Sequence, residues 1–134
     1  MKSVFADTFF YLALLDARDE HHPQVLRYLQ HSRDFILTTH WVFAEVANAM
    51  SGTVLRTAVV DLLMTLESDP SVIVAGSGED LYRRGLELYA NRPDKEWSLT
   101  DCISFVVMKD HGIQEALTGD HHFTQAGFQI LLGD

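Results

Sequence analysis

The sequence predicts an α/β fold of three layers, α/β/α, with an open, mostly parallel central sheet. Two observations lead to this class. Short apolar runs alternate along the chain with stretches of helical spacing, and turn-forming residues separate the two kinds of segment. Strands that alternate with helices form parallel sheets with right-handed crossovers. The length of 134 residues suits a single domain, so we assign residues 1–134 to one folding unit.

Five short apolar runs predict the strands. They cover residues 2–6, 35–38, 72–74, 113–118 and 128–132. Consecutive apolar residues, such as Val4, Phe5 and Ala6 in the first run, are typical of a strand buried on both faces. Asp69 and Pro70 before the third strand, and Gly76 and Gly78 after it, supply turns.

Helices are predicted between the first four strands. Residues 9–15 form a helix that ends at the charged residues 16–20. Pro23 can open the next helix, because its missing N–H is harmless in a first turn. The apolar stripe of that helix is Val25, Leu26 and Leu29. Two more helices, residues 41–50 and 54–66, are separated by Gly52. The apolar face of the first of these is Val42, Val46, Ala49 and Met50.

The second half of the chain continues the alternation. Residues 81–89 are helical, and residues 91–96 form a polar loop. A central helix then enters at Trp97, stops at Gly112 and carries an apolar body suited to burial: Ile103, Phe105, Val106, Val107 and Met108. Residues 120–125 form one helical turn before the last strand.

Composition narrows the possible functions. The formal charge is −9, whereas a protein that holds nucleic acid by phosphate neutralisation alone should be basic. A nucleic-acid role therefore needs a bound cation, a partner or a local basic patch such as Arg83 with Arg84, or Arg92 with Lys95. The single cysteine, Cys102, excludes an internal disulfide framework and suits a reducing cytoplasm.

The N-terminal segment, residues 2–15, is similar to a short signal peptide. Asp7 interrupts its apolar run, however, and no small-residue cleavage site follows. We therefore interpret the segment as part of the mature domain. No other stretch approaches the ~20 apolar residues of a membrane span, so we expect no membrane association.

Four acids are predicted to meet at the carboxyl edge of the sheet, where open α/β sheets bind ligands. Asp7 ends the first strand, and Asp120 lies just beyond the fourth. Asp101 begins the helix that leads into the fourth strand, and Glu45 lies on the helix after the second. Glu45 has only apolar and aromatic neighbours, and such an acid is typically paired or bound to metal.

Helix capping is the alternative explanation for three of these acids. Asp7 and Asp120 stand where the N-caps of the following helices belong. Ser98 and Asp101 have the spacing of a capping box. Each cap explains one residue, whereas a common site explains why all of the acids reach one edge.

Crowded carboxylates favour hard divalent cations. Without a cation at least one acid should hold a proton, and all-oxygen ligands suit Mg²⁺ or Mn²⁺ better than zinc. Such an ion lowers the pKa of a bound water, and a second ion ~4 Å away would stabilise the leaving oxygen of a phosphoryl displacement. A histidine zinc site is not favoured, because no pair has helical metal-binding spacing. His121 and His122 stand next to Asp120, and one of them could contact a phosphate or orient this acid, but we favour surface or packing roles for both.

Two other enzyme classes begin with an acid after the first strand. Phosphatases of the haloacid dehalogenase kind need a second aspartate two residues later, and this position is Phe9. Receiver domains need paired acids at the end of the first strand, and Asp7 stands alone there. Both classes are rejected.

Four segments resemble the four acidic motifs of PIN domains, most closely those of VapC-type toxins from bacterial toxin–antitoxin pairs. They are VFADT (residues 4–8), TTHWVFAEV (38–46), SLTDCISF (98–105) and LTGDHHF (117–123). The order and spacing match over nearly the whole chain. Some members carry an additional acid beside the fourth one, whereas the neighbours here are Thr118 and Gly119.

The resemblance implies a Mg²⁺- or Mn²⁺-dependent endoribonuclease with RNA as substrate, a small antitoxin as partner and a homodimeric state. It implies Asp7, Glu45, Asp101 and Asp120 as catalytic and metal-binding acids, and Thr8 and Thr118 as supporting hydroxyls. Two alternatives stay open: a non-catalytic PIN-like interaction module, and a PIN nuclease of RNA processing without an antitoxin.

Overall fold

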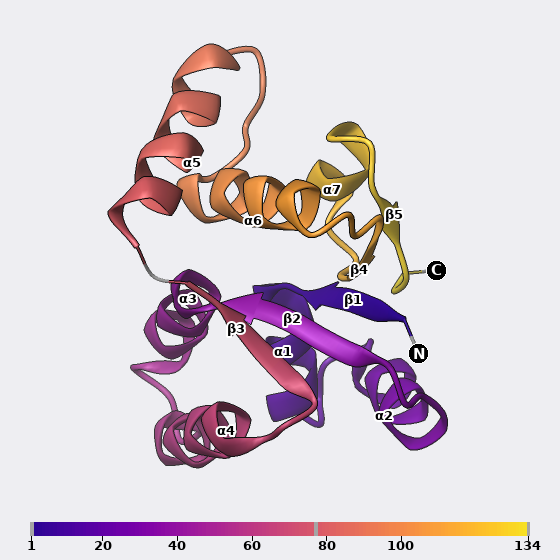
Figure 1. The fold of residues 1–134 in the computed structure, drawn as a ribbon. Coiled ribbons are helices and arrows are strands. Elements are labelled where there is room, and N and C mark those ends of the chain that lie inside the picture. Colours follow the sequence, from indigo (N-terminus) through magenta and orange to yellow (C-terminus); the bar gives the residue numbers. More distant parts are fainter. Residues whose placement is uncertain (1, 77, 134) are drawn as a thin grey trace.

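The computed structural model describes residues 2–76 and 78–133, and it has the predicted three-layer architecture (Figure 1). Within these residues five strands form one sheet in the order β3-β2-β1-β4-β5. They are β1 Ser3–Ala6, β2 Phe35–Thr39, β3 Val72–Ala75, β4 Glu115–Leu117 and β5 Gln129–Ile130. Every neighbouring pair is parallel, so the sheet is fully parallel where a mostly parallel one was predicted.

Helices cover both faces of the sheet (Figure 1). The first four lie on one face and the last three on the other. Their bounds are α1 Thr8–Leu15, α2 His22–His31, α3 His40–Met50, α4 Arg56–Ser68, α5 Glu79–Asn91, α6 Leu99–Asp110 and α7 His121–Gln125. None of the helices in the described ranges has the length and apolar character needed to cross a membrane.

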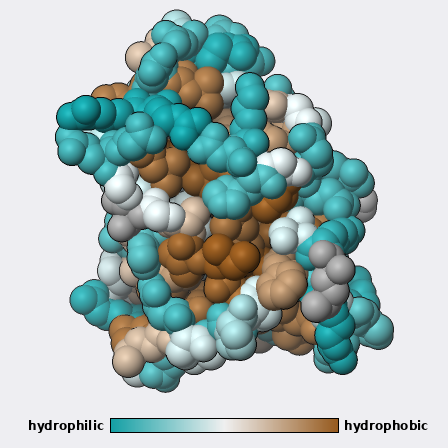
Figure 2. All heavy atoms as spheres, viewed as in Figure 1, coloured by the Kyte–Doolittle hydropathy of each residue, from teal (hydrophilic) through white to brown (hydrophobic). Residues whose placement is uncertain are grey.

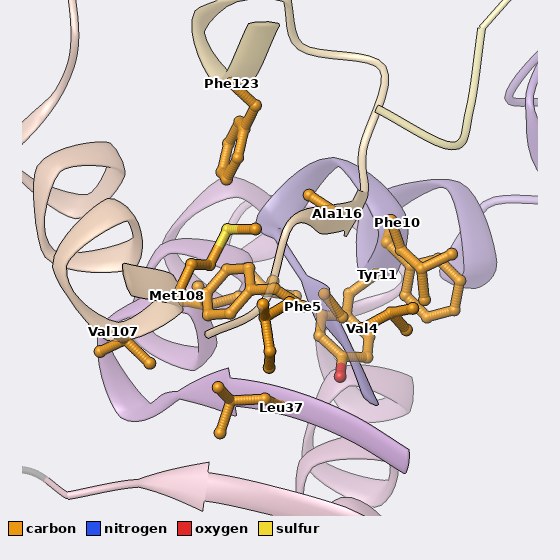
Figure 3. Close-up of a cluster of buried hydrophobic side chains, with 14 of the residues drawn as sticks. Val4, Phe5, Phe10, Tyr11, Leu37, Val107, Met108, Ala116 and Phe123 are labelled. Atoms are coloured by element: carbon orange, nitrogen blue, oxygen red, sulfur yellow. The ribbon is translucent and has the colours of Figure 1, made fainter. Parts of the chain in front are cut away.

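The core surrounds β1, the central strand (Figure 3). Residues 4–6 are fully buried. Phe10 and Tyr11 of α1 pack on one side of the strand, and Met108 of α6 and Phe123 of α7 pack on the other. A strand covered on both faces has no polar side, which explains why the first apolar run shows no alternation.

Some predicted boundaries and faces were wrong. The last two strands are shorter than predicted. β4 ends at Leu117 because the N–H of Thr118 turns back to the carbonyl of Ala116, at 3.0 Å. Val54 precedes α4 and is 96% exposed. In α2 only Val25 is buried, while Leu26 and Leu29 are each 38% exposed. The reason is that α2 packs at the margin of its layer, against α1.

The strand register brings distant parts of the chain together at the carboxyl edge. Ala6 of β1 lies opposite Leu117 of β4, so Asp7 and Thr118 follow directly on neighbouring strands. β2 and β4 flank β1, which makes this the point where the strand order reverses. α3 starts at the same edge, directly after β2, and α6 starts there because it runs back toward the beginning of β4.

Candidate active site

Asp7 is the most deeply buried carboxylate at this edge, with 3% of its surface exposed. It occupies the N-cap position of α1, but its side chain accepts no capping hydrogen bond. Thr118 Oγ1 donates to Asp7 Oδ2 at 3.2 Å. Oδ1 has no hydrogen-bond partner among the described residues. The capping explanation is therefore wrong for Asp7. Its Oδ1 is buried and can still bind a ligand.

The pKa of Asp7 is raised to about 7. Burial is the largest cause, the negative charge of Asp101 is the next, and Glu45 and Asp120 add to it, while a backbone hydrogen bond from Thr8 acts in the opposite direction. Repulsion of this kind falls off with distance. The other three predicted acids therefore all lie within electrostatic reach of Asp7.

Asp101 has two structural partners. It forms a capping box with Ser98, as predicted: its N–H donates to Ser98 Oγ at 3.0 Å, and its Oδ2 accepts the Ser98 N–H at 3.1 Å. The same Oδ2 lies 3.0 Å from Nδ1 of His122. Burial raises the pKa of Asp101, whereas the Ser98 and His122 hydrogen bonds lower it.

Asp120 caps α7, and His122 connects it to Asp101. Asp120 Oδ1 accepts the backbone N–H of His122 at 2.9 Å and lies 3.5 Å from the imidazole Nδ1. Ligand atoms of Asp101, Asp120 and His122 all lie within 4.8 Å of one another. The interpretation of His122 as a surface or packing residue was wrong. Its position in the first turn of a helix capped by Asp120 is the signal that could have revealed this contact.

Glu45 is held by the other predicted hydroxyl. It is half-buried on α3, and its Oε1 accepts a hydrogen bond from Thr8 Oγ1 at 2.5 Å. Thr8 thus contacts Glu45, as Thr118 contacts Asp7. Thr8, at the start of α1, thus connects this helix to α3, and Thr118, just after β4, connects that strand to the end of β1.

Capping and clustering turn out to be compatible, because each carboxylate has two oxygens. Asp101 and Asp120 each use one oxygen for a helix cap. The other oxygens, Oδ1 of Asp101 and Oδ2 of Asp120, accept no hydrogen bond from the described part of the chain. Capping alone, the alternative explanation for three of the acids, therefore does not account for the arrangement that the structure shows.

This set of donors fits a hard divalent cation. A buried carboxylate without compensation is unfavourable, and the unpartnered oxygen of Asp7 is such a group. Oxygen ligands from several carboxylates suit Mg²⁺ or Mn²⁺, and one imidazole, that of His122, is compatible with Mn²⁺.

Most of the candidate RNA-contacting cations are already paired. Arg83 is held by Glu79, Arg84 by Asp110 and Arg92 by Asp94. Lys95 takes part in no ion pair of the described residues. It lines a hollow of about 350 Å³ together with His122, which leaves it the best placed of the four to approach a phosphate at the site.

Comparison with known proteins agrees with this geometry. The family model of the PIN domain matches residues 4–129. The 23S rRNA-specific endonuclease VapC20 of Mycobacterium tuberculosis is 31% identical over 128 residues, which cover 93% of this chain and 95% of VapC20.

Solved structures show the same likeness. The crystal structure of M. tuberculosis VapC20, a sarcin–ricin loop cleaving toxin, superposes with a TM-score of 0.88 at 27% identity, and covers 97% of this chain and 99% of that one. A toxin–antitoxin complex from Klebsiella pneumoniae shares the fold, with a TM-score of 0.67 at 15% identity over 96% of this chain and 95% of that one. The chain therefore belongs to the PIN domain family, and within it is similar over almost its full length to a VapC-type toxin endonuclease.

Proposed function

We propose that this protein is a Mg²⁺- or Mn²⁺-dependent endoribonuclease that hydrolyses RNA phosphodiester bonds as the toxin of a toxin–antitoxin pair. One observation carries the proposal: Asp7 is buried with an unpartnered oxygen in the negative field of three other acids. The likeness to VapC20, a 23S rRNA-specific endonuclease, supports it over nearly the whole chain.

The proposed catalytic and metal-holding residues are the four acids, with two supporting hydroxyls and one imidazole. They are Asp7, Glu45, Asp101 and Asp120, then Thr8 and Thr118, then His122. When bound, the ion supplies positive charge and Lewis acidity toward a phosphodiester. The protein's own groups orient the acids: the Thr118 hydroxyl holds Asp7, and the Ser98 N–H and the His122 ring fix Asp101.

The proposed substrate is a structured loop of ribosomal RNA. VapC20 is described as cleaving the sarcin–ricin loop, and the present chain shares its fold and 27% of its residues in the superposition. The free thiol of Cys102 suits a reducing compartment, and we place the protein in the cytoplasm, where this RNA is found.

The proposed protein partners are a small antitoxin and a second copy of the chain. Figure 2 shows hydrophobic side chains gathered in the middle of one face. On the edge strand β3, Ile73 is 46% exposed. Tyr82, Leu86 and Tyr89 of α5 are 38–49% exposed at helical spacing. Exposed apolar side chains that share a face are typical of an interaction surface. Size-exclusion chromatography with light scattering tests the dimer.

A cleavage assay tests the proposed activity. The purified protein is incubated with 23S rRNA and with a synthetic sarcin–ricin hairpin in Mn²⁺, Mg²⁺ or EDTA. We expect cleavage with either cation and none in EDTA. Asp101→Asn, which keeps the shape of the capping side chain, should abolish cleavage, while the matched variant Asp110→Asn at the other end of α6 should retain it.

Two outcomes would contradict this proposal in different ways. If the wild type cuts neither RNA with either cation, the nuclease assignment fails. Unchanged cleavage by Asp101→Asn would show that the acids are not the catalytic groups, and binding without cleavage would favour the interaction module.

A further inference from the structure

We propose that a hollow beside the acids binds one nucleobase next to the phosphodiester that is cut, an inference that rests on the proposed endoribonuclease function. The hollow has a volume of about 580 Å³. Its lining includes Phe9, Glu20, His21, Gln24, Gly119 and His121.

Three residues that line the hollow are chain neighbours of residues in the acidic site. Phe9 directly follows Thr8, which holds Glu45. Gly119 and His121 flank Asp120 on its two sides. A base belonging to a nucleotide beside the scissile phosphate is therefore within reach of this hollow when the phosphate lies at the acids.

Aromatic rings form one side of the hollow. The ring of Phe9 lies against the backbone of Gly119, because a Cβ there would stand 2.6 Å from Phe9 Cζ. The ring of His21 contacts Phe9 edge-on, with 4.9 Å between centroids. His121 is exposed at the start of α7. Proteins recognise unpaired RNA bases by stacking them on Phe, Tyr, Trp or His rings.

Polar groups near these rings suit the edge of a base. Gln24 Oε1 accepts the N–H of Gly133 at 3.2 Å, which leaves the amide N–H groups of Gln24 as donors. The Glu20 carboxylate, with 83% of its side chain exposed, is an acceptor. A nucleobase that carries both donors and acceptors can use both residues.

The charge of the protein favours base binding as a source of RNA affinity. Phosphate contacts give an affinity that falls steeply with salt, and they require cationic side chains. This chain has a formal charge of −9. Stacking of a neutral base adds affinity that depends little on salt, roughly ten-fold per base.

The test compares histidine variants with RNAs that lack single bases. His121→Ala and His21→Ala are the pocket variants, and His31→Ala, exposed at the end of α2, is the matched control. Binding of a sarcin–ricin hairpin is measured by fluorescence anisotropy in Mn²⁺ at pH 8, above the range in which free imidazole titrates. For this measurement every protein also carries Asp101→Asn, so that the hairpin stays intact. The same hairpin is made abasic at each nucleotide that flanks the cut.

We expect each pocket variant to bind the intact hairpin roughly five- to ten-fold more weakly, with the dependence of affinity on salt unchanged. One abasic hairpin should weaken wild-type binding by a similar factor, and the pocket variants should lose nothing further on that RNA. His31→Ala should behave as wild type. The Mn²⁺-induced rise in melting temperature should be the same in all four proteins, which shows that the acidic site is intact.

Several outcomes would overturn the pocket. One is that a pocket variant and an abasic hairpin each weaken binding and that their effects multiply when they are combined. Another is that the slope of log affinity against log salt concentration falls by about one per histidine removed, as it does when a phosphate contact is lost. The third is that the hairpin does not bind at all. If His21→Ala alters folding, His121→Ala decides alone. Failure of the wild type to cleave contradicts the proposed function instead, and the binding comparison still decides the pocket.

Discussion

The two ends of the sheet differ in how their charged side chains are arranged: opposite charges are paired at the amino end, and acids cluster at the carboxyl end. At the amino end, Lys2 before β1 pairs with Glu115 of β4 at 2.9 Å, and Arg84 makes two hydrogen bonds to Asp110 at the end of α6. At the carboxyl end, Asp7 follows β1 and lies within electrostatic reach of Asp101 at the start of α6, and His122 is the one basic side chain of the described residues in contact with these acids.

The same strands and helices therefore carry neutralised charges at one end of the sheet and the acids of the proposed site at the other. Exposed ion pairs at the amino end contribute little to stability, because water screens them. The buried acids at the carboxyl end repel one another and destabilise the fold until a proton or a cation compensates them. The same helix, α6, ends in the first environment and begins in the second.

The sharpest test of this contrast changes one acid at each end of β4. Asp120→Asn should lower RNA cleavage at least ~100-fold, because even residues that only support a metal site account for 10- to 100-fold. Asn is also a good N-cap, so α7 should remain folded. Glu115→Gln should leave the rate within about two-fold in the same assay. Similar losses in both variants would remove the distinction between the two ends.

A second prediction concerns the destabilising effect of the buried charge of Asp7. In EDTA at pH 8, Asp7→Asn should raise the free energy of unfolding by roughly 1–4 kcal/mol, since the burial and repulsion of its charge disappear. Urea denaturation of both proteins measures this. A destabilised Asp7→Asn would mean that the carboxylate is favourably compensated in the folded protein.

The same residue predicts a dependence on pH. The pKa of Asp7 is raised to about 7, whereas an unfolded aspartate titrates near 3.9, so the folded state binds this proton more tightly. The contribution of Asp7 to stability is therefore full below pH ~4 and is lost as pH rises to about 7. Metal-free wild type should lose stability over this interval relative to Asp7→Asn. Parallel pH profiles of the two proteins would contradict the raised pKa.

A fourth prediction uses the cation itself. At a Mn²⁺ concentration about 100-fold above its Kd, the folded state should gain about 2.7 kcal/mol, which corresponds to a rise in melting temperature of roughly 5–10 °C. The rise should be larger at pH 8 than at pH 5, because protons compete for Asp7. Differential scanning fluorimetry gives the result, and Asp101→Asn, which lacks one carboxylate, should show a much smaller rise.

The smallest effect is expected at the amino end. Arg84→Ala should lower the free energy of unfolding by no more than about 1 kcal/mol, because both side chains of its pair with Asp110 are 40–44% exposed. The loss should be the same with and without Mn²⁺, as measured by urea denaturation. A Mn²⁺-dependent loss would connect this pair to the acidic site.

The edge of the sheet at which the acids gather could be predicted from the sequence. Apolar runs locate the ends of strands, and the carboxyl ends of parallel strands meet at one edge. Asp7 and Asp120 were located by this reasoning. The capping box of Ser98 and Asp101 was likewise evident, since its spacing is a local pattern.

Contacts that depend on the strand order could not be predicted in this way. Hydrophobic pattern shows that β1 and β4 are strands, but it does not show that they are neighbours in register, which is what brings Thr118 to Asp7. The position of His122 just after Asp120 indicates that it lies near that acid, but its contact with Asp101 depends on how α7 packs against α6. Leu26 and Leu29 have the periodicity of a core stripe, yet the margin of a layer leaves them half exposed.

The hydrogen bond from Thr118 to Asp7 joins residues 111 positions apart. During synthesis the N-terminal strands can form early, but the acidic site stays incomplete until Asp120 and the strand before it have emerged from the ribosome. For a protein proposed to cut ribosomal RNA, the acidic site is therefore incomplete while most of the chain is being made.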